Sequence, residues 1–137
     1  MKSVKKESVT ADKNADRRQQ PRYNVELRVQ LIGSGMLPMH VRTVDVSSVG
    51  IHFDCDRTTA QHLMPPGESV APDRFYTARF KIPDEIEGSK TLTVVTKVID
   101  VRPVLGDSYR VSMRFARFGG QSRARLESYL STLTPGN

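Results

Sequence analysis

Hydrophobic and polar residues alternate in the first ordered stretch of the chain. Apolar residues occupy every second position from Val25 to Leu31, with polar residues between them. A period of two places one face of a strand against a core and the other in water, so a strand is predicted from Tyr23 onward. Gly33, Ser34 and Gly35 interrupt it, and an extended run over 39–45 follows. These two strands are predicted to form a hairpin.

Four further extended runs follow, over 51–53, 75–82, 91–101 and 109–115. Residues 58–64 have the composition of a single helical turn, and Pro83 is expected to end the run before it. Six strands within about 95 residues, joined by short polar connections without a long helix, favour an antiparallel barrel or sandwich.

The two ends of the chain differ from this pattern. Leu126, Tyr129, Leu130 and Leu133 recur at spacings of three and four, which predicts an amphipathic helix over 121–133 that plugs or flanks the barrel. Residues 1–16 carry only isolated apolar side chains and are predicted to be a flexible basic tail. One domain over 17–132 and a short tail over 133–137 complete the expected organisation.

Charge and composition limit the classes of partner. The 137 residues carry a net charge of +6, and residues 1–22 hold seven basic against three acidic residues, so an anionic partner such as a phosphate is expected. The apolar runs are far shorter than the roughly 20 residues of a membrane helix, and no secretory signal follows the start, which predicts a cytoplasmic protein with no membrane span.

Residues that could carry catalysis or bind metal are scattered. The histidines are His40, His52 and His62. None has a nucleophile or carboxylate at catalytic spacing, so each is predicted to have a surface or packing role. Cys55 is the only cysteine and lies between two aspartates, whose charge opposes thiolate formation. Ser47 lacks a visible base. No enzyme activity, structural metal or cofactor is predicted.

A first motif contains the arginines that precede the first strand. Arg17, Arg18 and Arg22 lie in the segment RRQQPR, with Arg18 and Arg22 four positions apart. A guanidinium forms paired hydrogen bonds to phosphate or to the O6 and N7 edge of guanine, and it stacks on bases. Taken alone, the segment also fits a solvated basic run.

A second motif bridges the second and third strands and contains Asp45, Ser47 and Gly50. A carboxylate accepts hydrogen bonds from guanine N1 and N2, a hydroxyl bonds base or phosphate, and glycine allows close approach of a ligand. Taken alone, the segment also fits an ordinary turn between strands.

In this order and spacing the two motifs resemble those of the PilZ family, RxxxR followed by [D/N]xSxxG. Arg18 and Arg22 match the first motif, and Asp45, Ser47 and Gly50 match the second. The similarity extends over roughly residues 17–132. One departure is Ser112, which stands where the closing strand of the family usually has glycine.

The resemblance implies a six-stranded antiparallel β-barrel with a C-terminal helix that binds the bacterial second messenger cyclic di-GMP on its outer surface. Arg18 and Arg22 would meet guanine edges and phosphates, while Asp45 and Ser47 would meet a guanine from the barrel side. Binding would order the arginine segment and signal to a downstream protein. Arg17 implies two intercalated ligand molecules per protomer.

Two alternatives remain open from the sequence. One is a PilZ-like adaptor that binds another protein and no nucleotide, although such adaptors typically lose the arginines that are present here. The other is a small nucleic-acid-binding barrel, which the 7% aromatic content and the nearly neutral body disfavour. We therefore expect no nucleic-acid partner.

Overall fold

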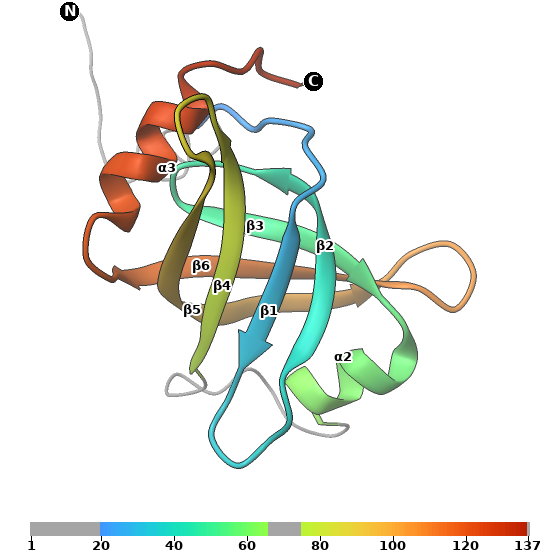
Figure 1. Ribbon diagram of the computed structural model, residues 1–137. Coiled ribbons are helices and arrows are strands. Elements are labelled where there is room, and N and C mark those ends of the chain that lie inside the picture. The colour runs from blue at the N-terminus through green and yellow to red at the C-terminus, as the bar shows by residue number, and fades with distance from the viewer. Residues whose placement is uncertain (1–19, 66–74, 137) are drawn as a thin grey trace, which may run out of the picture.

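The computed structural model describes residues 20–65 and 75–136, and these form a closed barrel of six strands (Figure 1). The strands follow one another around the barrel in the order β1-β2-β3-β6-β5-β4, and all neighbours are antiparallel. Their bounds are β1 Arg28–Ile32, β2 Met39–Val46, β3 Gly50–Cys55, β4 Phe75–Asp84, β5 Gly88–Pro103 and β6 Tyr109–Phe118. The predicted antiparallel barrel with a C-terminal helix is confirmed.

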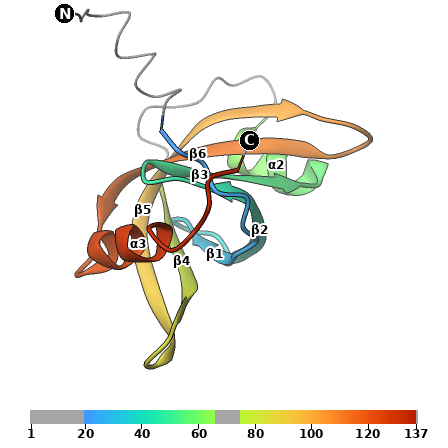
Figure 2. The same cartoon turned by 90° about the horizontal axis from the view of Figure 1, so that it is seen from above.

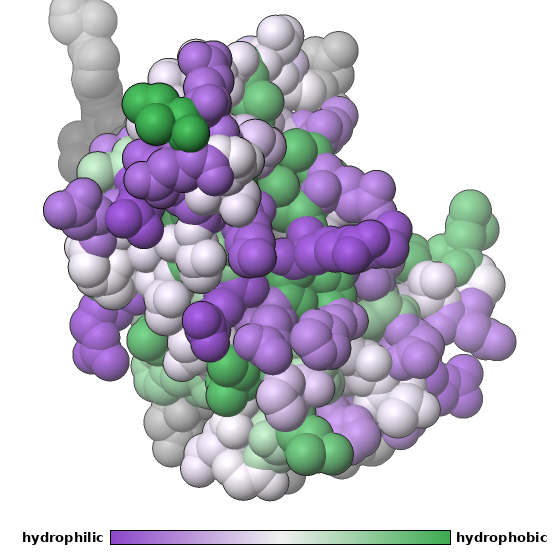
Figure 3. Space-filling model, in the orientation of Figure 1, coloured by the Kyte–Doolittle hydropathy of each residue, from purple (hydrophilic) through white to green (hydrophobic). Residues whose placement is uncertain are grey.

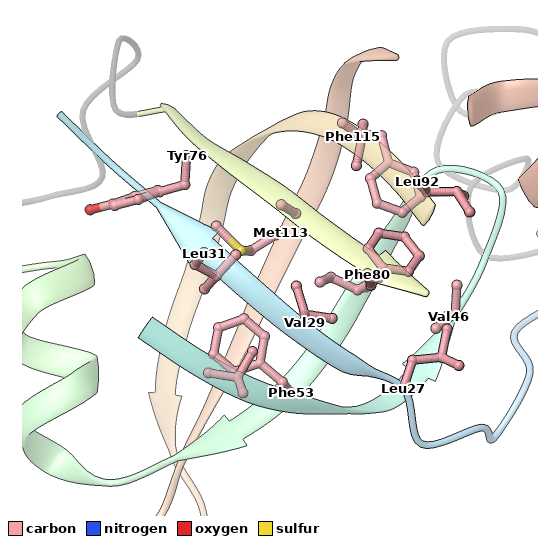
Figure 4. Packing of buried hydrophobic residues seen from close by; sticks show 14 of the residues in the cluster. Leu27, Val29, Leu31, Val46, Phe53, Tyr76, Phe80, Leu92, Met113 and Phe115 are labelled. Atoms are coloured by element: carbon pink, nitrogen blue, oxygen red, sulfur yellow. The ribbon is translucent and has the colours of Figure 1, made fainter. Parts of the chain in front are cut away.

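The core lies inside the barrel, where alternate side chains of every strand meet. Figure 4 shows Leu31 of β1, Phe53 of β3 and Met113 of β6 pointing toward one another. The one polar inward position of β5 is Thr96, which is fully buried and donates a hydrogen bond to the carbonyl oxygen of Tyr76 at 2.8 Å. Its hydroxyl is therefore satisfied, as burial of a polar group requires.

The first strand starts later than its alternating pattern predicts. Leu27 is buried as the pattern requires, but regular pairing with β2 begins only at Arg28. One backbone bond remains here, from the N–H of Thr43 to the carbonyl oxygen of Leu27 at 2.9 Å. The side chain of Thr43 supplies the others: its Oγ1 accepts from the N–H of Leu27 at 2.8 Å and donates to the carbonyl oxygen of Val25 at 2.6 Å. Period two therefore identifies the inward face correctly and the strand boundary incorrectly.

The predicted end of the fourth strand is also wrong, because β4 continues through Pro83 to Asp84. Pairing between β1 and β4 stops at Val29 and Phe80, while β4 remains paired with β5 as far as Asp84 and Gly88. Beyond Phe80, β4 is thus an edge strand, where proline is tolerated. The β4–β5 hairpin extends from the barrel in this region, as Figure 2 shows.

Two helices lie outside the barrel wall. The predicted helical turn is α2, Arg57–Leu63, and Asp56 caps it by accepting from the N–H of Thr59 at 2.8 Å. The C-terminal helix α3, Ser122–Leu130, flanks β4 and β5 and buries Leu126 and Leu130. It is shorter than the predicted 121–133. Neither helix of the described ranges is long and apolar enough to cross a bilayer.

Candidate ligand-binding site

A tight turn between β2 and β3 forms the centre of the site, and Ser47 builds it. The Ser47 side chain is fully buried. Its Oγ accepts from the N–H groups of Val49 at 3.1 Å and Gly50 at 3.2 Å, and its own N–H donates to the carbonyl oxygen of Gly50 at 2.9 Å. This hydroxyl therefore shapes the turn.

Gly50 is needed because β3 and β6 approach closely at this position. It pairs with Arg114, and a Cβ added to Gly50 would collide with the carbonyl oxygen of Met113. The glycine therefore serves the packing of two strands. At the other end of the turn, the register between β2 and β3 shifts between Thr43 and Asp45, which places Asp45 opposite His52.

The carboxylate of Asp45 joins two cationic or protonatable side chains. Its Oδ1 accepts from Arg22 Nε at 2.7 Å, lies 2.6 Å from Arg22 Nη2 and lies 2.9 Å from His52 Nδ1. Arg22 Nη1 also lies 3.5 Å from Ser47 Oγ. Within the described residues, Oδ2 of Asp45 has no hydrogen-bond partner. One carboxylate oxygen thus fixes Arg22, and no described residue donates to the other.

Electrostatics keep this carboxylate ionised. Burial alone would raise the pKa of Asp45, whose side chain is 14% exposed. Hydrogen bonds from His52 and Arg22, together with their charges, outweigh burial and hold the pKa below its ordinary value. Asp45 is therefore a fixed negative charge at neutral pH.

The backbone around Arg22 is tied to the barrel from two sides. Tyr23 and Val46 exchange backbone hydrogen bonds of 2.8 and 3.0 Å. The N–H of Gly136, near the C-terminus, donates to the carbonyl oxygen of Arg22 at 2.7 Å. Arg22 is consequently held in place, with its guanidinium over the turn.

A groove of about 450 Å³ extends from this turn across β6 to the start of α3. Its wall includes Arg22, Gly50 and His52 on one side and the aromatic ring of Phe118 on the other. The guanidinium of Arg123 stands 4.5 Å from the centre of the Phe118 ring. The groove contains several cations and a guanidinium stacked on an aromatic ring, and Asp45 adjoins it through its contacts with Arg22 and His52. Acceptor, cations and stacking surface together are the features that bind phosphates and bases.

The structure brings four of the six predicted site residues together: Arg22, Asp45, Ser47 and Gly50. Arg17 and Arg18 lie outside the described residues, so their predicted role is untested. Sequence reasoning missed His52, which was assigned only a surface or packing role, and Arg123 with Phe118. Alternation along the third strand from Gly50 could have indicated that His52 points outward. Arg123 on α3 and Phe118 at the end of β6 are brought to the groove only by the fold.

Metal binding and thiol chemistry find no support in the described ranges. They contain no group of three or more His, Cys, Asp or Glu residues arranged to hold a metal ion. Burial, followed by the charges of Asp56 and Asp54, raises the pKa of the Cys55 thiol to about 11. The prediction that Cys55 is unreactive agrees with this shift.

A family model for the PilZ domain matches residues 16–132. The chain belongs to the PilZ domain family. No curated protein sequence matches it, so the similarity to individual proteins rests on solved structures.

Several solved structures share the fold at low sequence identity. The Bacillus subtilis inhibitor of motility MotI/DgrA is 15% identical with a TM-score of 0.62, and the match covers 84% of this chain and 50% of that one. The PilZ domain of Escherichia coli YcgR with c-di-GMP is 15% identical with a TM-score of 0.53, covering 85% and 91%. Borreliella burgdorferi PlzA in complex with c-di-GMP is 9% identical with a TM-score of 0.52, covering 93% and 58%. The chain thus spans about half the length of MotI/DgrA.

Proposed function

We propose that this PilZ domain is a receptor for cyclic di-GMP and not an enzyme. The observation that carries the proposal is the cluster of Arg22, Asp45 and Ser47 beside the groove, because Arg22 of the first motif meets two residues of the second there. The solved YcgR and PlzA structures contain c-di-GMP, which supports the same ligand class for this chain.

A guanine suits the acceptor that the cluster leaves open. Asp45 Oδ2 can accept from guanine N1–H or N2–H while Oδ1 continues to hold Arg22. The guanidinium of Arg22 is then fixed in a plane, so less side-chain freedom is lost when it binds a phosphate or the O6 and N7 edge. Arg22 and Asp45 act together in this proposal.

The second wall of the groove would bind the remainder of the ligand. Phe118 and Arg123 offer a flat surface on which a base can stack, and Arg114 adds a cation that pairs with no described residue. Arg17 and Arg18 would approach from the N-terminal segment. Ordering that segment on the barrel would create a new surface for a downstream protein in the cytoplasm.

Calorimetric titration of the full chain with cyclic di-GMP tests this proposal and its stoichiometry. We expect two ligand molecules per protomer, because two stacked ligands carry four phosphate charges and Arg17 supplies a third guanidinium. Arg17→Leu is expected to reduce the number to one. One molecule per parent protomer would contradict the stoichiometry, and no binding heat at all would contradict the receptor function.

A further inference from the structure

A second groove lies between β1 and the projecting β4–β5 hairpin, away from the site described above. Pairing of β1 with β4 ends at Val29 and Phe80, and the hairpin continues beside β1 without touching it through backbone bonds. Figure 2 shows the hairpin extending from the barrel on this side. The space between them is a groove of about 640 Å³, called here the β1–β4 groove.

The lining of the β1–β4 groove is mostly apolar, with cations around it. Leu27, Phe80 and Ile82 contribute to the lining, and Arg79 and Lys81 lie beside them on β4. Figure 3 shows hydrophobic surface between hydrophilic side chains over β1 and β4. The groove therefore suits an apolar anchor that is accompanied by negative charge.

The positive charge of the groove is not balanced by the barrel itself. The side chains of Arg28, Arg79 and Lys81 are in the lining, and none of the three makes an ion pair or hydrogen bond to any described residue. Among the described residues, Glu26 is the one acidic residue in the lining, and it pairs with Arg42 at 3.1 Å. Three exposed cations thus lack a counter-charge from the part of the chain that the structure describes.

The tip of the β4–β5 hairpin has the complementary character. Ile86 is 91% exposed, and the exposed Glu85 and Glu87 flank it without a side-chain partner among the described residues. Asp84 stiffens the turn by accepting from the N–H groups of Ile86 at 3.1 Å and Glu87 at 2.7 Å. The tip thus presents one apolar anchor between two carboxylates on a preformed turn.

We propose that the hairpin tip of a second copy of this chain occupies the β1–β4 groove. Tip and groove share strand β4, so one two-fold axis near Ile82 and Pro83 serves both contacts at once. At roughly 3.3 Å per residue, the tip and Arg79 lie at similar distances of about 10 Å on opposite sides of that axis. Each Ile86 then enters the partner's groove beside Arg79. Side chains make this contact, and the two strand edges do not pair through their backbones, because Pro83 and Lys81 disfavour such pairing.

Analytical ultracentrifugation of the full chain without nucleotide tests the proposal. A small, charged contact predicts weak self-association between about 10 µM and 1 mM that weakens several-fold from 50 to 500 mM NaCl, since salt screens exposed charges. The control variant Arg117→Glu changes an exposed arginine outside the groove. It should associate like the parent.

Charge reversal makes the test specific. Glu85→Lys with Glu87→Lys reverses the tip, and Arg79→Glu with Lys81→Glu reverses the groove. Each double variant alone should be monomeric, and an equimolar mixture of the two should associate again, because both contacts of the mixed dimer regain opposite charges. Restored association also shows that both variants are folded. A parent that stays monomeric at 1 mM and 50 mM NaCl, or a mixture that stays monomeric, would overturn the proposal.

Discussion

Two outer faces of the same barrel differ in the ion pairing of Arg22 on one face and of Arg28 and Arg79 on the other. On the face formed by the β2–β3 turn, Arg22 is fixed by Asp45, which lies on the barrel itself. On the β1–β4 face, Arg28 and Arg79 extend into solvent without a described partner. A cation held by a carboxylate has one geometry to offer, which favours a small ligand of defined shape. Unpaired cations attract negative charge over a wider range of geometries.

The largest expected difference between the faces concerns cyclic di-GMP. Arg22→Ala should weaken binding roughly 5- to 150-fold, because one bidentate arginine contact to guanine contributes about 1–3 kcal/mol. Arg18→Ala is expected to weaken binding by a similar factor. Arg79→Ala removes an arginine from the other face and should leave the affinity unchanged in the same calorimetric titration. Equal losses for Arg22→Ala and Arg79→Ala would show that binding depends only on overall charge.

Stability should distinguish the faces next. Ser47→Ala leaves the N–H groups of Val49 and Gly50 without their acceptor inside the turn, so the free energy of unfolding should fall by about 1–3 kcal/mol. Ser89→Ala, on the exposed lining of the β1–β4 groove, should change it by no more than about 0.5 kcal/mol. Urea unfolding followed by circular dichroism measures both. If Ser47→Ala has the same free energy of unfolding as the parent, the hydroxyl does not stabilise the turn.

A smaller effect should appear with pH. The pKa of Asp45 is lowered in the folded protein, so its ionised form adds stability above the unfolded pKa of about 4, and this stability is lost as the pH falls through the folded pKa. The parent should therefore exceed Asp45→Asn in unfolding free energy at pH 5, where Asp45 is ionised. That excess should shrink below about pH 4. A constant excess down to pH 2.5 would contradict the assignment.

Extended runs between turn residues predicted the six strands, and alternation predicted the inward face of the first, because burial on one face of a strand follows a local period of two. Alternation could not locate the start of β1, since the side chain of Thr43, distant in sequence, accepts from the N–H of Leu27 there in place of a backbone carbonyl. The prediction that Pro83 ends the fourth strand was wrong for a related reason. A proline is tolerated in a strand where its edge is unpaired, and the sequence does not show that β1 no longer pairs with β4 at Pro83.

Sequence reasoning reached the candidate site through its motifs and missed what register and packing add. Asp45 and Ser47 were identified because their motif, together with the arginine motif, resembles those of the PilZ family. The contact of His52 with Asp45 requires the register of β2 with β3, and the approach of Arg123 requires the position of α3 on the barrel. The structure also gives Ser47 and Gly50 roles in the turn and in strand packing, which their residue types alone leave undecided.

The central claim is that cyclic di-GMP binds the face of the β2–β3 turn. An NMR titration of the uniformly labelled full chain, which follows every backbone amide as cyclic di-GMP is added, tests it most directly. We predict the largest shifts at Ser48, Val49, Gly50 and His52 and near Phe118, with small shifts at Arg28, Gln30 and Lys81. Largest shifts along the β1–β4 groove, or no shifts at millimolar ligand, would contradict the account.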